Sequence, residues 1–173
     1  GIAALFMWFA PDDAPSAARK QRIRKSMSDP ITAIRDPVIA SLCALSFCTM
    51  GAFVGLFNAI AFRVSEPPYS LGLDTSAVYL FYPTAVLGPI AASWFQKQIN
   101  TLSACLILIG IMIAGMFLTW LPSVFAAAVG LGVFTFAFLG VNSLTSSWAV
   151  DRAHRTGRSP VGTSGAYLST YYA

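Results

Sequence analysis

The sequence predicts an all-α membrane protein with four complete transmembrane helices and two partial ones. Of its 173 residues, 56% are hydrophobic and only 10% are charged, whereas a typical soluble domain carries about 25% charged residues. Four apolar runs approach or exceed the length of about 20 residues that a helix needs to cross a bilayer. The charged residues gather between these runs. A lipid bilayer is therefore the expected surrounding of most of the chain.

The densest run of charge, Arg19–Lys25, gives the spans their predicted direction. It holds five of the eleven Lys and Arg residues, and basic residues beside membrane spans remain on the cytoplasmic side. From this start, alternation of the spans puts ten basic residues inside and only Arg63 outside. We expect 11–36, 95–101 and 151–160 to be cytoplasmic. A nucleic-acid partner is not expected, because no soluble domain accompanies the basic run.

The chain divides into three predicted segments. Residues 1–10 are apolar but too few to span, and we interpret them as the end of a transmembrane helix whose start is missing. Residues 11–36 form a cytoplasmic loop, and residues 37–173 form a truncated C-terminal transmembrane half. The chain is thus expected to be an internal piece of a longer protein.

Val38–Phe62 is the first complete predicted span. Asp36-Pro37 is typical of a helix start, because the carboxylate caps free N–H groups and proline suits the first helical position. Gly51 and Gly55 lie on one face, where they either let another helix approach or only fill packing positions. Asn58 shares that face, and an amide at this depth must meet protein or water.

Two further spans follow. Ser76–Trp94 is expected to cross back and to be kinked or broken, because it contains Pro83 and Gly88-Pro89. Phe95–Asn100 is a tight inner turn, and Leu102–Leu121 crosses outward without a charged residue.

Val124–Val150 crosses inward again and carries one polar stripe. Its members are spaced by 3, 4, 3 and 4 residues, which places them on one helix face: Gly132, Thr135, Leu139, Asn142 and Ser146. Such a stripe either lines a wet cavity or forms hydrogen bonds with a neighbouring helix. The second alternative is open for the Ser and Thr residues, and we favour the cavity for Asn142. The basic loop Asp151–Arg158 and a partial helix, Val161–Ala173, complete the chain.

Reactive groups are few and placed unfavourably for catalysis. The sequence has no metal-ligand spacing, phosphate-binding motif or nucleophile elbow, so no enzyme activity, cofactor or metal site is expected. His154 is the single histidine and stands in a charged loop. The cysteines are interpreted as inert packing residues within apolar runs: Cys43, Cys48 and Cys105.

Several stretches together resemble the major facilitator superfamily. They are the inner turn after the second span (Gly88–Lys97), Phe57-Asn58 before Arg63, Asn142-Ser143 with Ser146-Ser147-Trp148, and Tyr167-Leu168 with Tyr171-Tyr172. The later stretches are similar to bacterial inner-membrane members of the drug:proton antiporter-like group. By this resemblance the chain would run from the end of helix six into helix eleven of a protein with two six-helix halves.

The resemblance implies a secondary active transporter that moves a small molecule across the inner (plasma) membrane by alternating access, as proton-coupled efflux. Its partners would be the bilayer, the substrate and the missing N-terminal half. The candidate cavity residues are Phe57, Asn58, Thr135, Asn142 and Ser146. All seven acidic residues fall in loops or at helix ends, so we expect a coupling carboxylate in the missing half. The alternative is a non-transporting membrane receptor or assembly protein.

Overall fold

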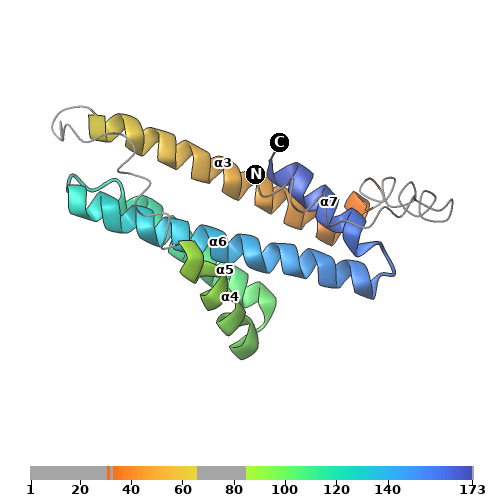
Figure 1. The fold of residues 1–173 in the computed structure, drawn as a ribbon. Coiled ribbons are helices and arrows are strands. Elements are labelled where there is room, and N and C mark those ends of the chain that lie inside the picture. Colours follow the sequence, from red (N-terminus) through yellow and green to blue (C-terminus); the bar gives the residue numbers. More distant parts are fainter. Residues whose placement is uncertain (1–30, 32, 66–84, 173) are drawn as a thin grey trace, which may run out of the picture.

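A computed structural model describes residues 31, 33–65 and 85–172, and every structural statement below concerns these residues. They form five helices and no strand (Figure 1): α3 (Pro37–Ser65), α4 (Leu87–Gln98), α5 (Thr101–Leu118), α6 (Val124–Arg155) and α7 (Pro160–Tyr171). The all-α prediction is therefore confirmed. The predicted helix end at 1–10, nearly all of the loop 11–36 and the beginning of the Ser76–Trp94 span lie outside the described residues.

Three of the five helices, α3, α5 and α6, are long and apolar enough to cross a membrane. They correspond to three of the four complete spans that the sequence predicts. The described part of the remaining span is α4, whose 12 residues reach about 18 Å at 1.5 Å per residue. A helix of that length does not cross the hydrocarbon layer by itself.

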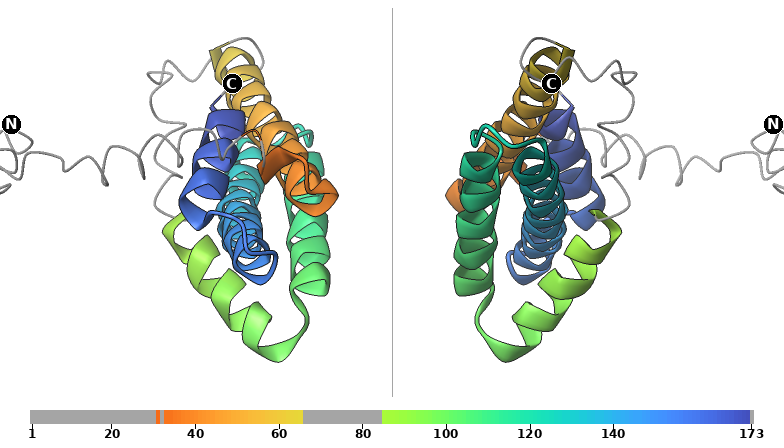
Figure 2. Two further views of the ribbon diagram at one scale, coloured as in Figure 1. Left: turned by 90° about the vertical axis from the view of Figure 1, so that its right-hand side faces the viewer. Right: turned by 90° about the vertical axis from the view of Figure 1, so that its left-hand side faces the viewer.

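The central element is α6, which contacts each of the other four helices. Figure 2 shows α5 and α7 on opposite sides of α6, while α3 lies across α6 and α7. Aromatic rings fill the contact between α3 and α6. The rings of Phe53 and Phe138 stack with centroids 4.4 Å apart, and Phe57 and Phe134 belong to the same buried cluster.

Glycines allow two helices to approach α6 closely. A Cβ atom on Gly115 of α5 would stand 2.7 Å from the Phe134 backbone nitrogen, and one on Gly130 of α6 would stand 2.8 Å from the Gly115 carbonyl oxygen. A Cβ on Gly88 of α4 would overlap the Phe136 carbonyl oxygen of α6. Small residues at such crossings let transmembrane backbones pack against each other. These glycines therefore set the α4–α6 and α5–α6 distances.

The turn between α4 and α5 is shorter than the sequence predicts. A turn is expected over Phe95–Asn100, but α4 continues to Gln98 and only Ile99 and Asn100 link it to α5. The Asn100 side chain ends the link by accepting a hydrogen bond of 2.8 Å from the Ser103 N–H, as an N-cap residue does. This cap fixes where α5 begins.

The long inner loop predicted at Asp151–Arg158 is also mostly helical, because α6 extends to Arg155. Asp151 and Arg155 form an ion pair of 2.9 Å at i and i+4, which supports a helix. Ala153 is fully buried within this last turn. At Gly157 the backbone takes a positive φ of 65°, which glycine adopts without strain. Ser159 then caps α7 by accepting from the Gly162 N–H.

The two ends of α3 are held by polar contacts. Asp36 accepts hydrogen bonds from the Val38 N–H at 2.9 Å and from the Arg152 Nε–H at 3.3 Å. At the other end, the Arg63 guanidinium donates to the Thr119 carbonyl at 2.6 Å and to the Trp120 carbonyl at 3.1 Å. The start of α3 thus meets the end of α6, and its end meets the turn between α5 and α6, as alternating spans predict.

The Asp36 contact gives a first prediction. Burial alone raises the pKa of Asp36, but hydrogen bonds from the Val38 and Ile39 N–H groups and the charge of Arg152 outweigh it and hold the pKa below its ordinary 3.8. A lowered pKa stabilises the fold at neutral pH, and this contribution disappears as the pH falls through the folded-state value. Asp36→Ala should cost about 1 kcal/mol of stability through the lost cap, measured by thermal unfolding in detergent.

Two controls separate the cap from the charge. Asp36→Asn keeps a capping side chain and should lose less than Asp36→Ala. Asp151→Asn removes an exposed pair, whose side chains are 54% and 75% exposed, and should change stability little. A difference between wild type and Asp36→Ala that stays equally large at pH 7 and well below 3.8 would contradict the role assigned to the ionised carboxylate.

Candidate solute pocket between α6 and α7

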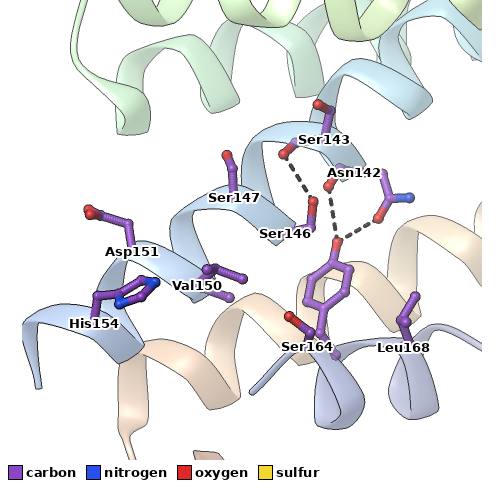
Figure 3. Close-up of a pocket in the computed structure, with 11 residues that line it drawn as sticks. Asn142, Ser143, Ser146, Ser147, Val150, Asp151, His154, Ser164 and Leu168 are labelled. Atoms are coloured by element: carbon purple, nitrogen blue, oxygen red, sulfur yellow. Dashed lines mark hydrogen bonds between the residues drawn. The ribbon is translucent and has the colours of Figure 1, made fainter. Parts of the chain in front are cut away.

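A pocket of about 680 Å³ lies between the second half of α6 and the beginning of α7 (Figure 3), with many polar residues in its lining although most of its wall area is apolar. Its size falls in the range of about 300–1,000 Å³ that is usual for small-molecule sites. Asn142 stands at one end and Asp151 with His154 at the other. The lining residues are Asn142, Ser143, Ser146, Ser147, Ala149, Val150, Asp151, His154, Ser164, Tyr167 and Leu168. A polar lining on an otherwise apolar pair of helices needs a partner or water to be stable.

A hydrogen-bonded network closes the Asn142 end of the pocket. The Tyr167 hydroxyl lies 2.5 Å from Asn142 Oδ1 and 2.6 Å from Thr145 Oγ1. Tyr167 and Thr145 are buried. Thr145 Oγ1 also lies 2.9 Å from the Val141 carbonyl, so its one proton is directed either to that carbonyl or to Tyr167. In the second case Tyr167 donates to Asn142 and both short contacts are satisfied. The network therefore joins α7 to α6 and orients the amide of Asn142.

The helix α3 also places a polar side chain beside this hydrogen-bonded network. Ser46 of α3 is 1% exposed, and its Oγ has no hydrogen-bond partner among the described residues. It lies near the Tyr167 hydroxyl. Buried hydroxyls are normally paired, so this junction of α3, α6 and α7 retains one unused hydrogen-bonding group.

The serines of α6 bond to their own helix. Ser146 Oγ donates to the Ser143 carbonyl at 3.0 Å, and Ser147 Oγ donates to the Leu144 carbonyl at 2.9 Å. This local bonding is typical of hydroxyl side chains in transmembrane helices. The oxygen lone pairs of both residues remain available to whatever occupies the pocket.

The five cavity residues predicted from the sequence do not lie together. Asn142 and Ser146 line the pocket. Thr135 is buried and donates to the Leu131 carbonyl at 2.7 Å, and Phe57 belongs to the aromatic cluster between α3 and α6. Asn58 is exposed on α3. The Asn142 side chain bonds a neighbouring helix and also lines the pocket, and its role in a wet cavity stays a prediction.

Sequence reasoning does not single out several pocket residues. Tyr167 stands out only as part of a family-like stretch, although a tyrosine among small residues such as Gly165 and Ala166 is a signal for a helix contact. The sequence predicts a loop at Asp151, and its place in the pocket follows from the extension of α6 to Arg155. Ser147 follows Ser146, the last residue of the predicted polar stripe. It lines the pocket because the pocket extends beyond the face of α6 that the stripe occupies.

The described residues include no group of three His, Cys, Asp or Glu side chains that would hold a metal ion. A second, smaller cavity of about 350 Å³ opens beside the start of α5, where Asn100 and Thr101 face Arg152 and Arg155 of α6. Its two arginines already pair with Asp36 and Asp151. The pocket between α6 and α7 is therefore the stronger candidate for a solute site.

Comparisons with known proteins relate the chain to transporters. It is 28% identical over 176 residues to an uncharacterised transporter of Buchnera aphidicola subsp. Baizongia pistaciae, a match that covers 98% of this chain and 42% of the relative. It is 31% identical over 173 residues to an uncharacterised MFS-type transporter of Bacillus subtilis strain 168, covering 98% of this chain and 41% of the relative.

The chain thus spans about two-fifths of the length of the curated relatives that it matches. No family model matches the chain, and no solved structure matches it. Together with the three helices suited to a bilayer, these similarities describe a multi-pass membrane protein that is similar to transporters, one of them of the MFS type.

Proposed function

We propose that the chain is part of a major-facilitator-type secondary active transporter that moves a small molecule by alternating access. The observation that carries this proposal is the pocket between α6 and α7, because it has the volume of a small-molecule site and holds four serines in its wall. Transporters hold their substrates in sites between helices, and this pocket runs along α6 from Asn142 to His154. The similarity to transporters supports the same proposal.

In this proposal, further helices of a longer protein complete the site. Asn58 is exposed on α3, and no atom lies within 4 Å of the position that a Cβ would take on Gly51 or Gly55 of the same helix. An amide on a membrane-facing surface is costly unless it meets protein or water. We therefore assign this face of α3 to the side on which an N-terminal half lies, with Asn58 directed to the shared cavity.

The finer proposal is proton-coupled efflux across the inner membrane, as in the drug:proton antiporter-like group. The basic segments Arg19–Lys25 and Arg152–Arg158 would be cytoplasmic, because basic loops are retained there. Proton coupling needs a group that titrates within the membrane. Among the described residues the acids are Asp36, before α3, and Asp151, in the last turn of α6. The coupling carboxylate is accordingly assigned to the rest of the protein.

Transport by the full-length protein in proteoliposomes tests this function. With an imposed pH gradient, solute flux should collapse when the gradient is dissipated by a protonophore. Neutralising each of the chain's seven acids singly should leave coupling intact: Asp12, Asp13, Asp29, Asp36, Glu66, Asp74 and Asp151. If one of these variants loses proton-driven flux but keeps solute exchange, the assignment of coupling to another part of the protein is wrong. Absence of flux for every solute, with folded protein, would favour a receptor or assembly role.

A further inference from the structure

The hydrogen-bonding character of the α6–α7 pocket restricts what it can hold. The hydroxyl protons of Ser146 and Ser147 are directed to carbonyl groups of α6, at 3.0 and 2.9 Å. A hydroxyl that has donated its proton presents only lone pairs to another partner. Ser143 and Ser164 have no fixed direction, since a serine hydroxyl rotates to donate or to accept. The two serines with fixed protons are therefore hydrogen-bond acceptors.

The pocket wall contains one acidic residue, Asp151, and one histidine, His154. Asp151 contributes a carboxylate, and none of the eleven described lining residues is Lys or Arg. Arg155 pairs with Asp151 at 2.9 Å; its side chain is 75% exposed, and both residues also line the smaller cavity beside the start of α5. An exposed pair of this kind is weak. A positively charged ligand therefore gains from Asp151 by competing with Arg155 for the carboxylate.

The acceptors also follow the geometry of the helix. Ser147 and Asp151 are separated by four residues, and Ser146 is adjacent to Ser147. Residues at i and i+4 are neighbours on a helix surface, whereas adjacent residues do not face each other. Ser147 and Asp151 therefore share one strip of α6, and Ser146 lies on the strip beside it. The amide N–H groups of Asn142, at the opposite end (Figure 3), remain available for an acceptor on the rest of the ligand.

We propose that the pocket selects an organic cation that carries N–H groups, such as a primary ammonium or guanidinium compound, with those groups directed to Ser146, Ser147 and Asp151. This inference rests on the proposed transport function and names the substrate class of that same site. A quaternary ammonium compound has the charge but no proton to donate, so it leaves the serine acceptors unpaired. A neutral alcohol has a proton but gains nothing from the carboxylate.

Binding to the full-length protein in lipid nanodiscs tests the selection. Butylammonium should bind about tenfold more tightly than butyltrimethylammonium, because hydrogen bonds from a charged donor discriminate by at least this factor. Empty nanodiscs correct for partition into lipid. Equal affinity for the two compounds, or preference for the quaternary one, would overturn the proposal.

The ion pair supplies matched variants with opposite expected effects. Asp151→Asn should weaken butylammonium binding about tenfold, whereas Arg155→Gln removes the competing cation and should leave it unchanged or tighten it. If the pair serves only to support α6, both variants should weaken binding equally, and that result would overturn the proposal. Ser146→Ala with Ser147→Ala should reduce the preference for butylammonium over its trimethyl analogue, and an unchanged preference would contradict the role of the hydroxyls.

Transport assays distinguish failure of this inference from failure of the proposed function. If the protein moves other solutes under a pH gradient but does not distinguish the two ammonium probes, the proposed transport function stands and the proposed substrate class is wrong. If the protein binds butylammonium with the expected preference but moves no solute, the proposed ligand class stands and the proposed transport function is wrong.

Discussion

Gly88→Ala is expected to prevent normal packing of α4 on α6 and to cost about 3 kcal/mol of stability. A methyl group at this position would overlap the Phe136 carbonyl oxygen and stand 2.9 Å from the Gly140 nitrogen. Both are backbone atoms, so no side chain can rotate away to make room. The helix would have to move as a whole, and its contact with α6 would open. The yield of folded full-length protein and its unfolding temperature in detergent measure the effect.

Gly110→Ala is the matched control for this prediction. Gly110 lies on α5, and no atom stands within 4 Å of the position that its methyl group would take. Alanine also favours helix over glycine by about 1 kcal/mol in water. This variant should fold as well as the wild type or slightly better. If Gly88→Ala and Gly110→Ala have the same stability, the close α4–α6 contact does not exist in the membrane.

Asn142→Leu is expected to lower the initial rate of transport about tenfold, equivalent to about 1.4 kcal/mol. The substitution removes the amide from the pocket and breaks the 2.5 Å contact with the Tyr167 hydroxyl. The effect on stability should be smaller, because hydrogen bonds between transmembrane helices contribute about 0.6 kcal/mol on average and Thr145 still bonds Tyr167 at 2.6 Å. Transport and unfolding temperature are measured on the same preparations.

Tyr167→Phe separates the two roles of Asn142. It breaks the contact with Asn142 and also the contact with Thr145, but leaves the amide in the pocket. If the amide acts on the solute, Tyr167→Phe should transport better than Asn142→Leu even though it loses more hydrogen bonds. Equal losses of transport and of folded protein in both variants would show that Asn142 serves only to pack α6 against α7.

Asn58→Leu, at an exposed position of α3, should reduce transport without lowering the stability of the described helices.

The helices themselves could be predicted from the sequence because a bilayer imposes a simple rule. An apolar run of sufficient length becomes a helix, and Asp36-Pro37 stands where α3 begins. The caps of α6 and α7, Ser123 and Ser159, are seen in the structure. The C-terminal end of α6 was less predictable, because charged residues follow the apolar run there. Asp151–Arg155 has the composition of a loop, but α6 continues through it because Ala153 is buried against the neighbouring helices.

The pocket was only partly predictable, because a periodic pattern gives the face of one helix and not its neighbour. The stripe on α6 includes Asn142 and Ser146, which line the pocket, but also Thr135, which bonds its own backbone. Which end of the stripe is covered depends on α7, a helix of 12 residues that packs along only part of α6. The partner of Asn142, Tyr167, lies 25 residues away, and no local pattern connects the two.

Thiol labelling at Ser146 tests most directly whether the α6–α7 pocket is part of a water-filled solute path. In full-length protein whose native cysteines are replaced by alanine, Ser146→Cys should react with a charged, membrane-impermeant methanethiosulfonate reagent. Two control positions should not react: Thr135→Cys, which is 1% exposed, and Leu106→Cys, which is 60% exposed on a face of α5 that we assign to lipid. If Cys at position 146 is as unreactive as Cys at position 106, the pocket does not contact water and the proposed path is contradicted.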